Sequence, residues 1–301
     1  MVIKMQSNFK KILAVTMLSG VLVSCMTSNN PSNKNLNSQN QKDVKNQTIE
    51  QTEYSVTGGS FHKANYQEAT KINSELAIIY SIEGYLERAK TKLIKAQELA
   101  NEHNQKLAIV DYAGGYYYQS IGANSIAEKY YQKALENHPK NYEAMNFYAQ
   151  FLCTEKEDYS RAQELFEKAL FMPNNNDMAQ TLFLYSQCMY KQGKKDDALA
   201  YMQRADKFRI DYKAAKLRLA QMYFERGEYK ECYKVIYSMK NDPQFFNNKL
   251  VLDMRLKLAE YANNKNEAAA VRLVLSSNNY NDEDIDKFFS AADQKDIDKN
   301  A

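Results

Sequence analysis

The chain of 301 residues contains 40 lysine and arginine residues against 37 aspartate and glutamate residues, which gives a net charge of +3. Three lysines and no acidic residue fall within residues 1–24, so residues 25–301 carry 37 charges of each sign. A nucleic-acid-binding protein needs a clustered basic face, which this balance does not suggest. We therefore expect no nucleic-acid partner.

The first 25 residues have the pattern of an export signal. Three lysines precede an apolar stretch over residues 12–23, which is too short to cross a bilayer because a spanning helix needs about 20 residues. Residues 22–25 resemble the lipobox of bacterial lipoproteins and end in Cys25. We interpret residues 1–24 as a lipoprotein signal peptide and Cys25 as the lipidation site. The alternative is an ordinary signal peptide followed by an incidental cysteine.

Lipidation at Cys25 sets the expected location of the protein. Cleavage before Cys25 leaves a thiol that carries diacylglycerol and an amine that is acylated, and several acyl chains give stable anchoring. In lipoproteins of this kind, an aspartate after the cysteine favours retention in the inner membrane, whereas Met26 stands here. We therefore expect a lipid-anchored protein on the periplasmic face of the outer membrane of a Gram-negative bacterium.

Polar segments flank the central part of the chain. Residues 25–66 follow the signal peptide, and residues 26 to about 60 are rich in Asn, Ser, Gln and Lys, a composition that cannot bury enough apolar surface to fold. We expect a disordered tether there, which would span on the order of 30–35 Å as a random coil. Residues 278–301 are again polar and acidic, and we interpret them as a C-terminal tail.

Between these segments, a pattern of small residues repeats five times. A first small residue is followed about twelve positions later by a second, with aromatic or aliphatic residues at fixed offsets. The first set is Ala77, Gly115, Ala149, Ser186 and Ala220, and the second is Ala89, Ala127, Ala162, Ala198 and Cys232. The second set recurs after 38, 35, 36 and 34 residues, which is typical of tetratricopeptide (TPR) repeats. Each repeat is then a pair of antiparallel helices that buries its apolar face by stacking on its neighbours.

A turn must separate the two helices of each repeat. Four repeats carry a glycine five residues before the second small residue, where a left-handed conformation ends a helix. These glycines are Gly84, Gly122, Gly193 and Gly227. The third repeat lacks the glycine, and its turn at residues 155–158 is one residue longer.

A sixth, degenerate helix pair follows at residues 248–275, with Asn263 and Asn264 in place of the turn glycine. Degeneration at the end of an array is expected of a capping repeat. We therefore predict one all-α domain over residues 67–277, a right-handed superhelical TPR solenoid of about six helix-turn-helix repeats.

Three cysteines lie within the predicted array, and an oxidising periplasm permits disulfides. Cys153 and Cys188 both lie late in the first helices of consecutive repeats, 35 residues apart. First helices of adjacent repeats pack side by side, which favours a Cys153–Cys188 disulfide. The alternative is that both are small, buried apolar residues. We expect Cys232, at a small-residue position, to be a buried free thiol.

Outward positions of the first helices are expected to line the concave side of the array, where a partner peptide would bind. This set is aromatic and amide-rich with few charges. It comprises Ile78, Tyr112, Tyr116, Asn146, Gln150, Phe183, Gln187, Tyr190, Leu217, Gln221 and Phe224. The alternative for each aromatic residue is packing within the superhelix.

Catalysis has little support in the sequence. The histidines His62, His103 and His138 have no cysteine or carboxylate at metal-ligand spacing. Motifs typical of metalloproteases, serine hydrolases and phosphate-binding loops are absent from the sequence. We expect no enzyme activity, no cofactor, no metal and no small-molecule substrate.

One stretch of the array is similar to a particular family. Residues 146–153 end in the run Phe151-Leu152-Cys153, which is not part of the generic TPR frame. With its lipobox and six repeats, the chain resembles the type IV pilus biogenesis and stability lipoproteins, the pilotin family of PilF or PilW type. Ala149 stands where that family carries glycine, and the long Asn-rich tether is a further departure.

The resemblance implies a function. Proteins of this type bind the secretin, the outer-membrane channel through which the pilus passes, and promote its localisation and oligomerisation. The lipid would direct the protein to the outer membrane, and the TPR surface would bind the secretin. The alternative is a TPR scaffold lipoprotein that acts in the assembly of outer-membrane β-barrel proteins.

Overall fold

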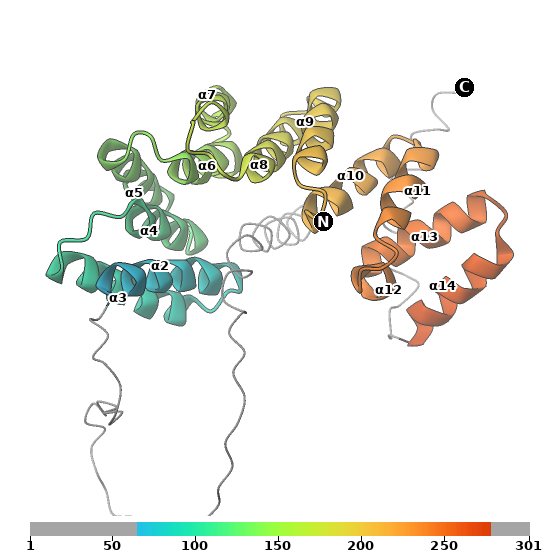
Figure 1. Ribbon diagram of the computed structural model, residues 1–301, viewed down its shortest axis with the longest axis horizontal. Coiled ribbons are helices and arrows are strands. Elements are labelled where there is room, and N and C mark those ends of the chain that lie inside the picture. Colours follow the sequence, from blue (N-terminus) through green and yellow to red (C-terminus); the bar gives the residue numbers. More distant parts are fainter. Residues whose placement is uncertain (1–64, 278–301) are drawn as a thin grey trace, which may run out of the picture.

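The computed structural model describes residues 65–277, and within this range the chain forms helices and no strand (Figure 1). Twelve of these helices form six antiparallel pairs. The pairs are α2 (Tyr66–Ile82) with α3 (Leu86–Glu102), α4 (Ala108–Ser120) with α5 (Asn124–Asn137), α6 (Tyr142–Phe151) with α7 (Tyr159–Leu170), α8 (Met178–Lys191) with α9 (Lys195–Phe208), α10 (Lys213–Glu225) with α11 (Tyr229–Ser238), and α13 (Lys249–Tyr261) with α14 (Lys265–Ser277). The predicted all-α helical-repeat solenoid is confirmed.

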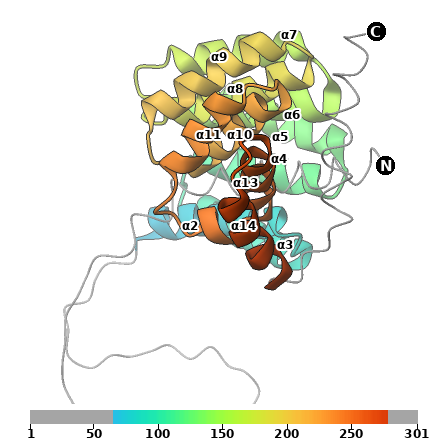
Figure 2. The ribbon, with the colours of Figure 1, turned by 90° about the vertical axis from the view of Figure 1, so that its right-hand side faces the viewer.

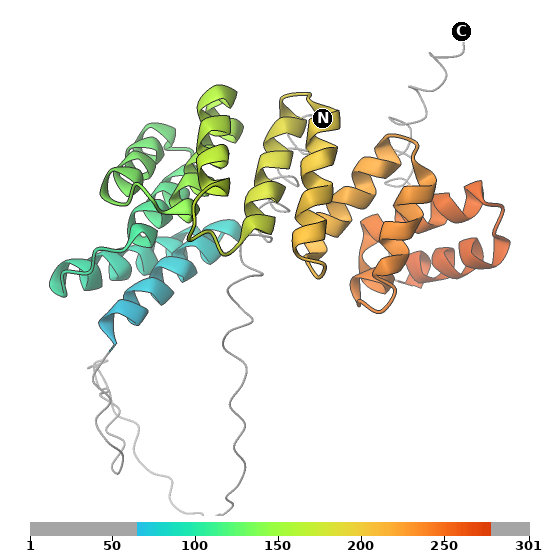
Figure 3. The same cartoon turned by 45° about the horizontal axis from the view of Figure 1, so that its top comes forward.

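The pairs stack into a curved array. Figure 1 shows them following an arc from α2 and α3 to α13 and α14, and Figure 2 looks at the array from the α13–α14 end. First helices of consecutive repeats touch, α2 against α4, α4 against α6 and α6 against α8. In Figure 3 the yellow α8–α9 pair stands beside the green α6–α7 pair. The predicted signal peptide, nearly all of the tether and the C-terminal tail lie outside the described residues and stay predictions.

Small residues set the distance between the two helices of a pair. Ala77, Ala89 and Ala127 are completely buried. At Gly115 in α4, an added Cβ would lie 2.6 Å from Cε1 of Tyr131 in α5, a distance that side chains do not tolerate. The small residues of the repeat pattern are therefore required by close helix approach.

The predicted turn glycines adopt the left-handed conformation. Their φ angles lie between +72° (Gly227) and +88° (Gly193), where residues with a Cβ are strained. In the second repeat, the amide of Ala123 then donates to the carbonyl of Tyr118 at 2.8 Å, five residues back. Asn263 takes the same role in the sixth repeat with φ +53°, since Asn tolerates this conformation better than most residues.

The third repeat makes its turn differently. After α6 the chain forms a π-helical turn, η2 (Leu152–Lys156), and Glu157 then adopts φ +55°. The closing hydrogen bond runs from the amide of Asp158 to the carbonyl of Leu152 at 3.0 Å and spans six residues instead of five. A π turn accommodates one extra residue without ending the helix, which accounts for the longer turn that the sequence predicts.

Side-chain caps fix where several helices begin. Asn141, Asp158 and Asp177 precede α6, α7 and α8, and each accepts a hydrogen bond from the amide three residues later, at 2.7, 3.1 and 3.0 Å. Such caps satisfy amides that have no partner within the helix and contribute about 1 kcal/mol each. They also fix the register of repeats three and four, which hold five of the eleven predicted groove residues.

Candidate protein-binding surface

The first helices of repeats two and three join through aromatic side chains. The ring of Tyr112 in α4 stacks on that of Phe147 in α6, with centroids 4.7 Å apart. The hydroxyl of Tyr112 donates to a carboxylate oxygen of Glu143 at 3.0 Å. Burial, and then the neighbouring Glu143 carboxylate, raise the pKa of Tyr112 well above its ordinary value. Tyr112 is therefore a neutral donor that holds two repeats together.

Hydrogen bonds of amide side chains join the first helices of repeats three and four, and of repeats four and five. Asn146 in α6 donates to the hydroxyl of Thr181 in α8 at 2.9 Å. Gln187 in α8 accepts from Nε of Arg218 in α10 at 3.3 Å. Polar groups are usually hydrogen-bonded where they are buried, and these bonds cross from each repeat to the next.

Arg218 is the centre of a charged cluster on repeats four and five. Its guanidinium lies 4.2 Å from the ring centroid of Tyr190 and 3.3 Å from a carboxylate oxygen of Glu225. The Tyr190 hydroxyl donates to the other oxygen of Glu225 at 2.5 Å. Partial burial, and then the Glu225 carboxylate, raise the pKa of Tyr190. The cluster fixes Tyr190 at the end of α8, pointing its hydroxyl toward α10.

The eleven predicted groove residues fall into two groups. Seven are buried: Ile78, Tyr112, Asn146, Gln150, Phe183, Gln187 and Phe224. Four are partly exposed: Tyr116, Tyr190, Leu217 and Gln221. The buried aromatic residues Tyr112 and Phe183 pack against the next repeat, which is the alternative that the sequence left open for them. Contact of either group with a partner stays a prediction.

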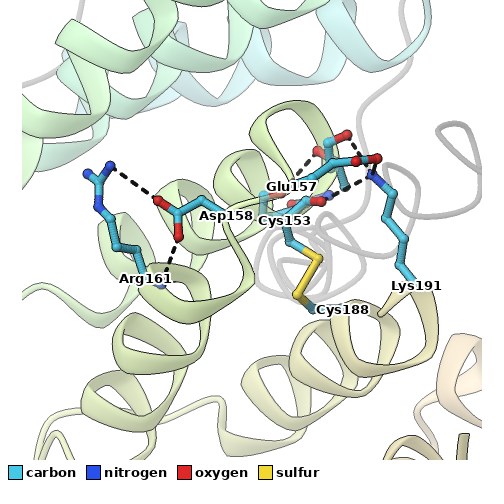
Figure 4. The surroundings of a disulfide bond; sticks show 8 residues. Cys153, Glu157, Asp158, Arg161, Cys188 and Lys191 are labelled. Atoms are coloured by element: carbon cyan, nitrogen blue, oxygen red, sulfur yellow. Dashed lines mark hydrogen bonds and ion pairs between the residues drawn. A yellow bond between two sulfur atoms is a disulfide. The ribbon is translucent and has the colours of Figure 1, made fainter. Parts of the chain in front are cut away.

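Cys153 in η2 and Cys188 in α8 form a disulfide, with Cα atoms 5.8 Å apart (Figure 4). Lys191, one turn after Cys188, donates to the carbonyls of Cys153 and Thr154 at 3.1 and 2.8 Å. Its ammonium also lies 3.4 Å from a carboxylate oxygen of Glu157. The disulfide and Lys191 thus attach the π turn of repeat three to repeat four.

A cavity of about 10 Å³ lies beside the disulfide. Its lining comprises Gln150, Cys153, Thr154, Leu184, Gln187, Cys188 and Lys191. This volume has room for about one water molecule, so the cavity cannot hold a partner side chain. Elsewhere in the array, Cys232 is a buried free thiol, and burial raises its pKa to about 12.

The remaining candidate residues are not gathered into a catalytic or metal site. Cys25 and His62 lie outside the described residues. His103 stacks on Tyr66 with centroids 3.5 Å apart, and His138 follows the last residue of α5. Across residues 65–277, no group of three or more His, Cys, Asp or Glu side chains is placed to hold a metal ion. No helix of this part is long and apolar enough to cross a membrane.

Sequence reasoning missed two cross-repeat residues, Arg218 and Lys191. Each lies on a first helix among apolar residues, and each bonds to a group that another repeat contributes. An arginine that interrupts the apolar pattern of α10 is the one signal in the sequence for Arg218. No comparable signal marks Lys191, because its acceptors exist only when the preceding repeat forms its π turn.

The stacked helix pairs, the small residues at their crossings and the left-handed turns define a TPR-type helical-repeat protein. Residues 122–205 match the family model of subunit 3 of the anaphase-promoting complex, or cyclosome. The solved structure of PilF from Pseudomonas aeruginosa is similar with a TM-score of 0.59, at 20% identity over 76% of this chain and 100% of PilF. That of PilW, a type IV pilus biogenesis factor, gives 0.56, at 21% identity over 70% of this chain and 94% of PilW. Such arrays are typically interaction scaffolds without catalytic activity.

The chain belongs to the same family as an uncharacterized protein of Haemophilus influenzae. The two are 33% identical over 153 residues, which cover 50% of this chain and 81% of that relative. A segment of this length holds about four repeats of the TPR period.

Proposed function

We propose that this protein is an outer-membrane lipoprotein of type IV pilus biogenesis that binds the pilus secretin and promotes its localisation and oligomerisation. The observation that carries the proposal is the six-repeat array, which shares its fold with PilF and PilW over most of the described residues. The run Phe151-Leu152-Cys153, which forms the start of the π turn, and the lipobox ending at Cys25 add independent support.

The array and the lipid have separate roles in this proposal. Acyl chains on Cys25 hold the protein at the membrane. The first helices present the partly exposed residues Tyr116, Tyr190, Leu217 and Gln221 to a segment of the secretin. Aromatic and amide groups of this kind suit a peptide, because the rings supply contact area and the amide supplies hydrogen bonds.

The test is secretin multimer formation in cells that lack this protein. These cells then express the wild type, a Cys25→Ala variant, or a double variant with Leu217→Arg and Gln221→Arg. Wild type alone should restore heat-stable secretin multimers to the outer membrane. A matched control is Leu273→Arg on α14, which places the same charge at a side chain that is 70% exposed and should behave as wild type.

The second candidate function is a scaffold in the assembly of outer-membrane β-barrel proteins, because a lipidated TPR array serves either role. The same strains separate the two. Normal secretin multimers together with a general loss of β-barrel proteins would favour the assembly scaffold and overturn the secretin proposal.

A further inference from the structure

Exposed apolar side chains lie at the C-terminal end of α9 and on the connections that follow α7 and α9. Phe171 is 81% exposed, Phe208 is 58% exposed and Ile210 is 76% exposed. We call these three residues the apolar edge. The connections after α3 and α5, at residues 103–107 and 138–141, carry no exposed large apolar residue. The connection after α11 carries one more such residue, Phe246 in the short helix α12 (Gln244–Asn247), which is 54% exposed. The exposure therefore begins at repeat three and continues toward the C-terminal end of the array.

Contacts between successive connections place the apolar edge on one side of the array. Asn174 donates to the carbonyl of Lys140 at 3.4 Å, which joins the connection after α7 to the one after α5. Arg209 pairs with Asp177 at 3.0 Å, which joins the connection after α9 to the one after α7. Lys213 pairs with Asp242 at 2.7 Å and continues the series. Phe171 and Ile210 thus project from neighbouring turns that are tied to one another.

Positive charge accompanies these side chains. Lys168 lies one turn before Phe171, and Lys207 directly precedes Phe208; both are exposed. Within residues 65–277, neither lysine lies within ion-pair distance of a carboxylate, whereas Arg209 is paired with Asp177. Two exposed carboxylates lie near these residues in the chain: Asp211 follows Ile210, and Glu164 lies one helical turn before Lys168. The edge therefore combines projecting apolar groups with two lysines whose charge is available to an anionic surface.

We propose that the apolar edge docks on the surface of a phospholipid bilayer with anionic headgroups. The apolar side chains stand at exposed helix ends and turns, beside the exposed lysines Lys168 and Lys207. Apolar tips that enter the acyl boundary while lysines extend to the headgroups match the chemistry of a membrane interface. The inference rests on the proposed lipid anchor, since three side chains give only weak binding and the anchor keeps the bilayer within reach.

Docking would orient the array on the membrane. The turns within the repeats, such as the one at Ile121 and Gly122, lie at the opposite ends of the helices from the connections between repeats. With the apolar edge on the bilayer, these turns point away from it, and the first helices remain open to a partner beside the membrane.

The chain contains no tryptophan, so one substitution creates a single fluorescent reporter. The full lipidated chain with Phe171→Trp is placed in vesicles of phosphatidylethanolamine and phosphatidylglycerol, with or without brominated lipid. We expect a blue shift of the emission and quenching by bromine. The matched control is Ile121→Trp, at a residue that is 44% exposed on the opposite side, and we expect neither effect there.

Further variants separate insertion from general adhesion. Adding Phe208→Ser with Ile210→Ser, or Lys168→Gln with Lys207→Gln, to the Phe171→Trp chain should cause loss of quenching while circular dichroism shows unchanged helix content. Equal quenching of both reporters, or an unshifted Phe171→Trp emission in vesicles, would overturn the inference. So would a shift that arises only when purified secretin is added. Failure of the proposed function shows instead as normal secretin multimers without this protein, a result that leaves the vesicle measurement unaffected.

Discussion

The third repeat and the second repeat end their first helices in different ways. In the second, Gly122 adopts φ +79° without strain, and the closing hydrogen bond spans five residues. In the third, Glu157 adopts φ +55° although it carries a Cβ, and a π turn extends the span to six residues. A left-handed residue is thus required in both turns, whereas its identity and the length of the turn are free to vary.

The irregular turn of the third repeat is stabilised by contacts with the fourth repeat. A non-glycine residue with positive φ and a π turn are both unfavourable. At this turn the disulfide and the two hydrogen bonds of Lys191 add contacts with the next repeat, and the turn of Gly122 has no such link. The run Phe151-Leu152-Cys153, which carries the resemblance to pilus lipoproteins, is therefore the segment in which the π turn and the disulfide meet.

The largest effect is expected from breaking the disulfide. Replacing both Cys153→Ala and Cys188→Ala removes a covalent link that closes a loop of 35 residues, and should lower the free energy of unfolding by about 4 kcal/mol. Urea unfolding followed by circular dichroism measures the loss. Reductant should shift the urea midpoint of the wild type in the same direction and leave the double variant unchanged. Identical midpoints for the oxidised and reduced wild type would show that the link adds no stability.

A smaller loss is expected in the second repeat, which depends on close packing. Gly115→Ala places a methyl group 2.6 Å from the ring of Tyr131, which is fully buried and cannot move freely. Overpacking of this kind costs about 1–3 kcal/mol. The matched measurement is the same substitution in a Tyr131→Leu background, where the smaller side chain should reduce the cost. Equal costs in both backgrounds would mean that the ring is not the obstacle.

Lys191 offers a way to weaken the third repeat without touching the disulfide. Lys191→Met keeps the apolar stem but removes the ammonium that caps the carbonyls of Cys153 and Thr154. We expect a loss of about 1–2 kcal/mol in the free energy of unfolding, because both carbonyls lose a charged donor. Lys194→Met, at an exposed lysine outside this turn, is the control and should change little. A loss of the same size in the control would point to a general charge effect.

Much of the fold follows from local sequence, because helix crossings need small residues wherever they occur and left-handed turns favour glycine. The roles of Ala89, Ala127 and Gly193 can therefore be predicted without knowing which residues pack against them. The longer turn of the third repeat is also visible as one extra residue, although the sequence does not show that a π turn absorbs it.

The candidate binding surface is less predictable, because exposure depends on the adjacent repeat. Phe183 and Asn146 occupy outward positions of their helices but are buried, with Tyr212 and Thr181 of the following repeats against them. The apolar edge lies at the end of α9 and on connections between repeats, where the periodic pattern of the helices no longer applies. Its residues become a group only when the contact between Arg209 and Asp177 places two connections together.

Exchanging the two kinds of turn residue should have unequal effects, and the smallest effect is expected at Glu157. Gly122→Glu forces a Cβ into φ +79° and should cost about 1–2 kcal/mol, although open space surrounds that position. Glu157→Gly removes the strain at φ +55° but adds freedom to the unfolded chain, which costs about 0.4–1 kcal/mol. Its exposed ion pair with Lys191 contributes little. The second substitution should therefore raise the free energy of unfolding by at most about 1.5 kcal/mol.

Urea midpoints of the two variants, measured under oxidising conditions, check this asymmetry. A Glu157→Gly chain that loses as much stability as the Gly122→Glu chain would mean that Glu157 makes a favourable contact beyond its ion pair. The π turn of repeat three would then depend on that residue as well as on the disulfide and Lys191. If Glu157→Gly instead stabilises the chain, the two turns share one backbone requirement and differ only in how the neighbouring repeat supports them.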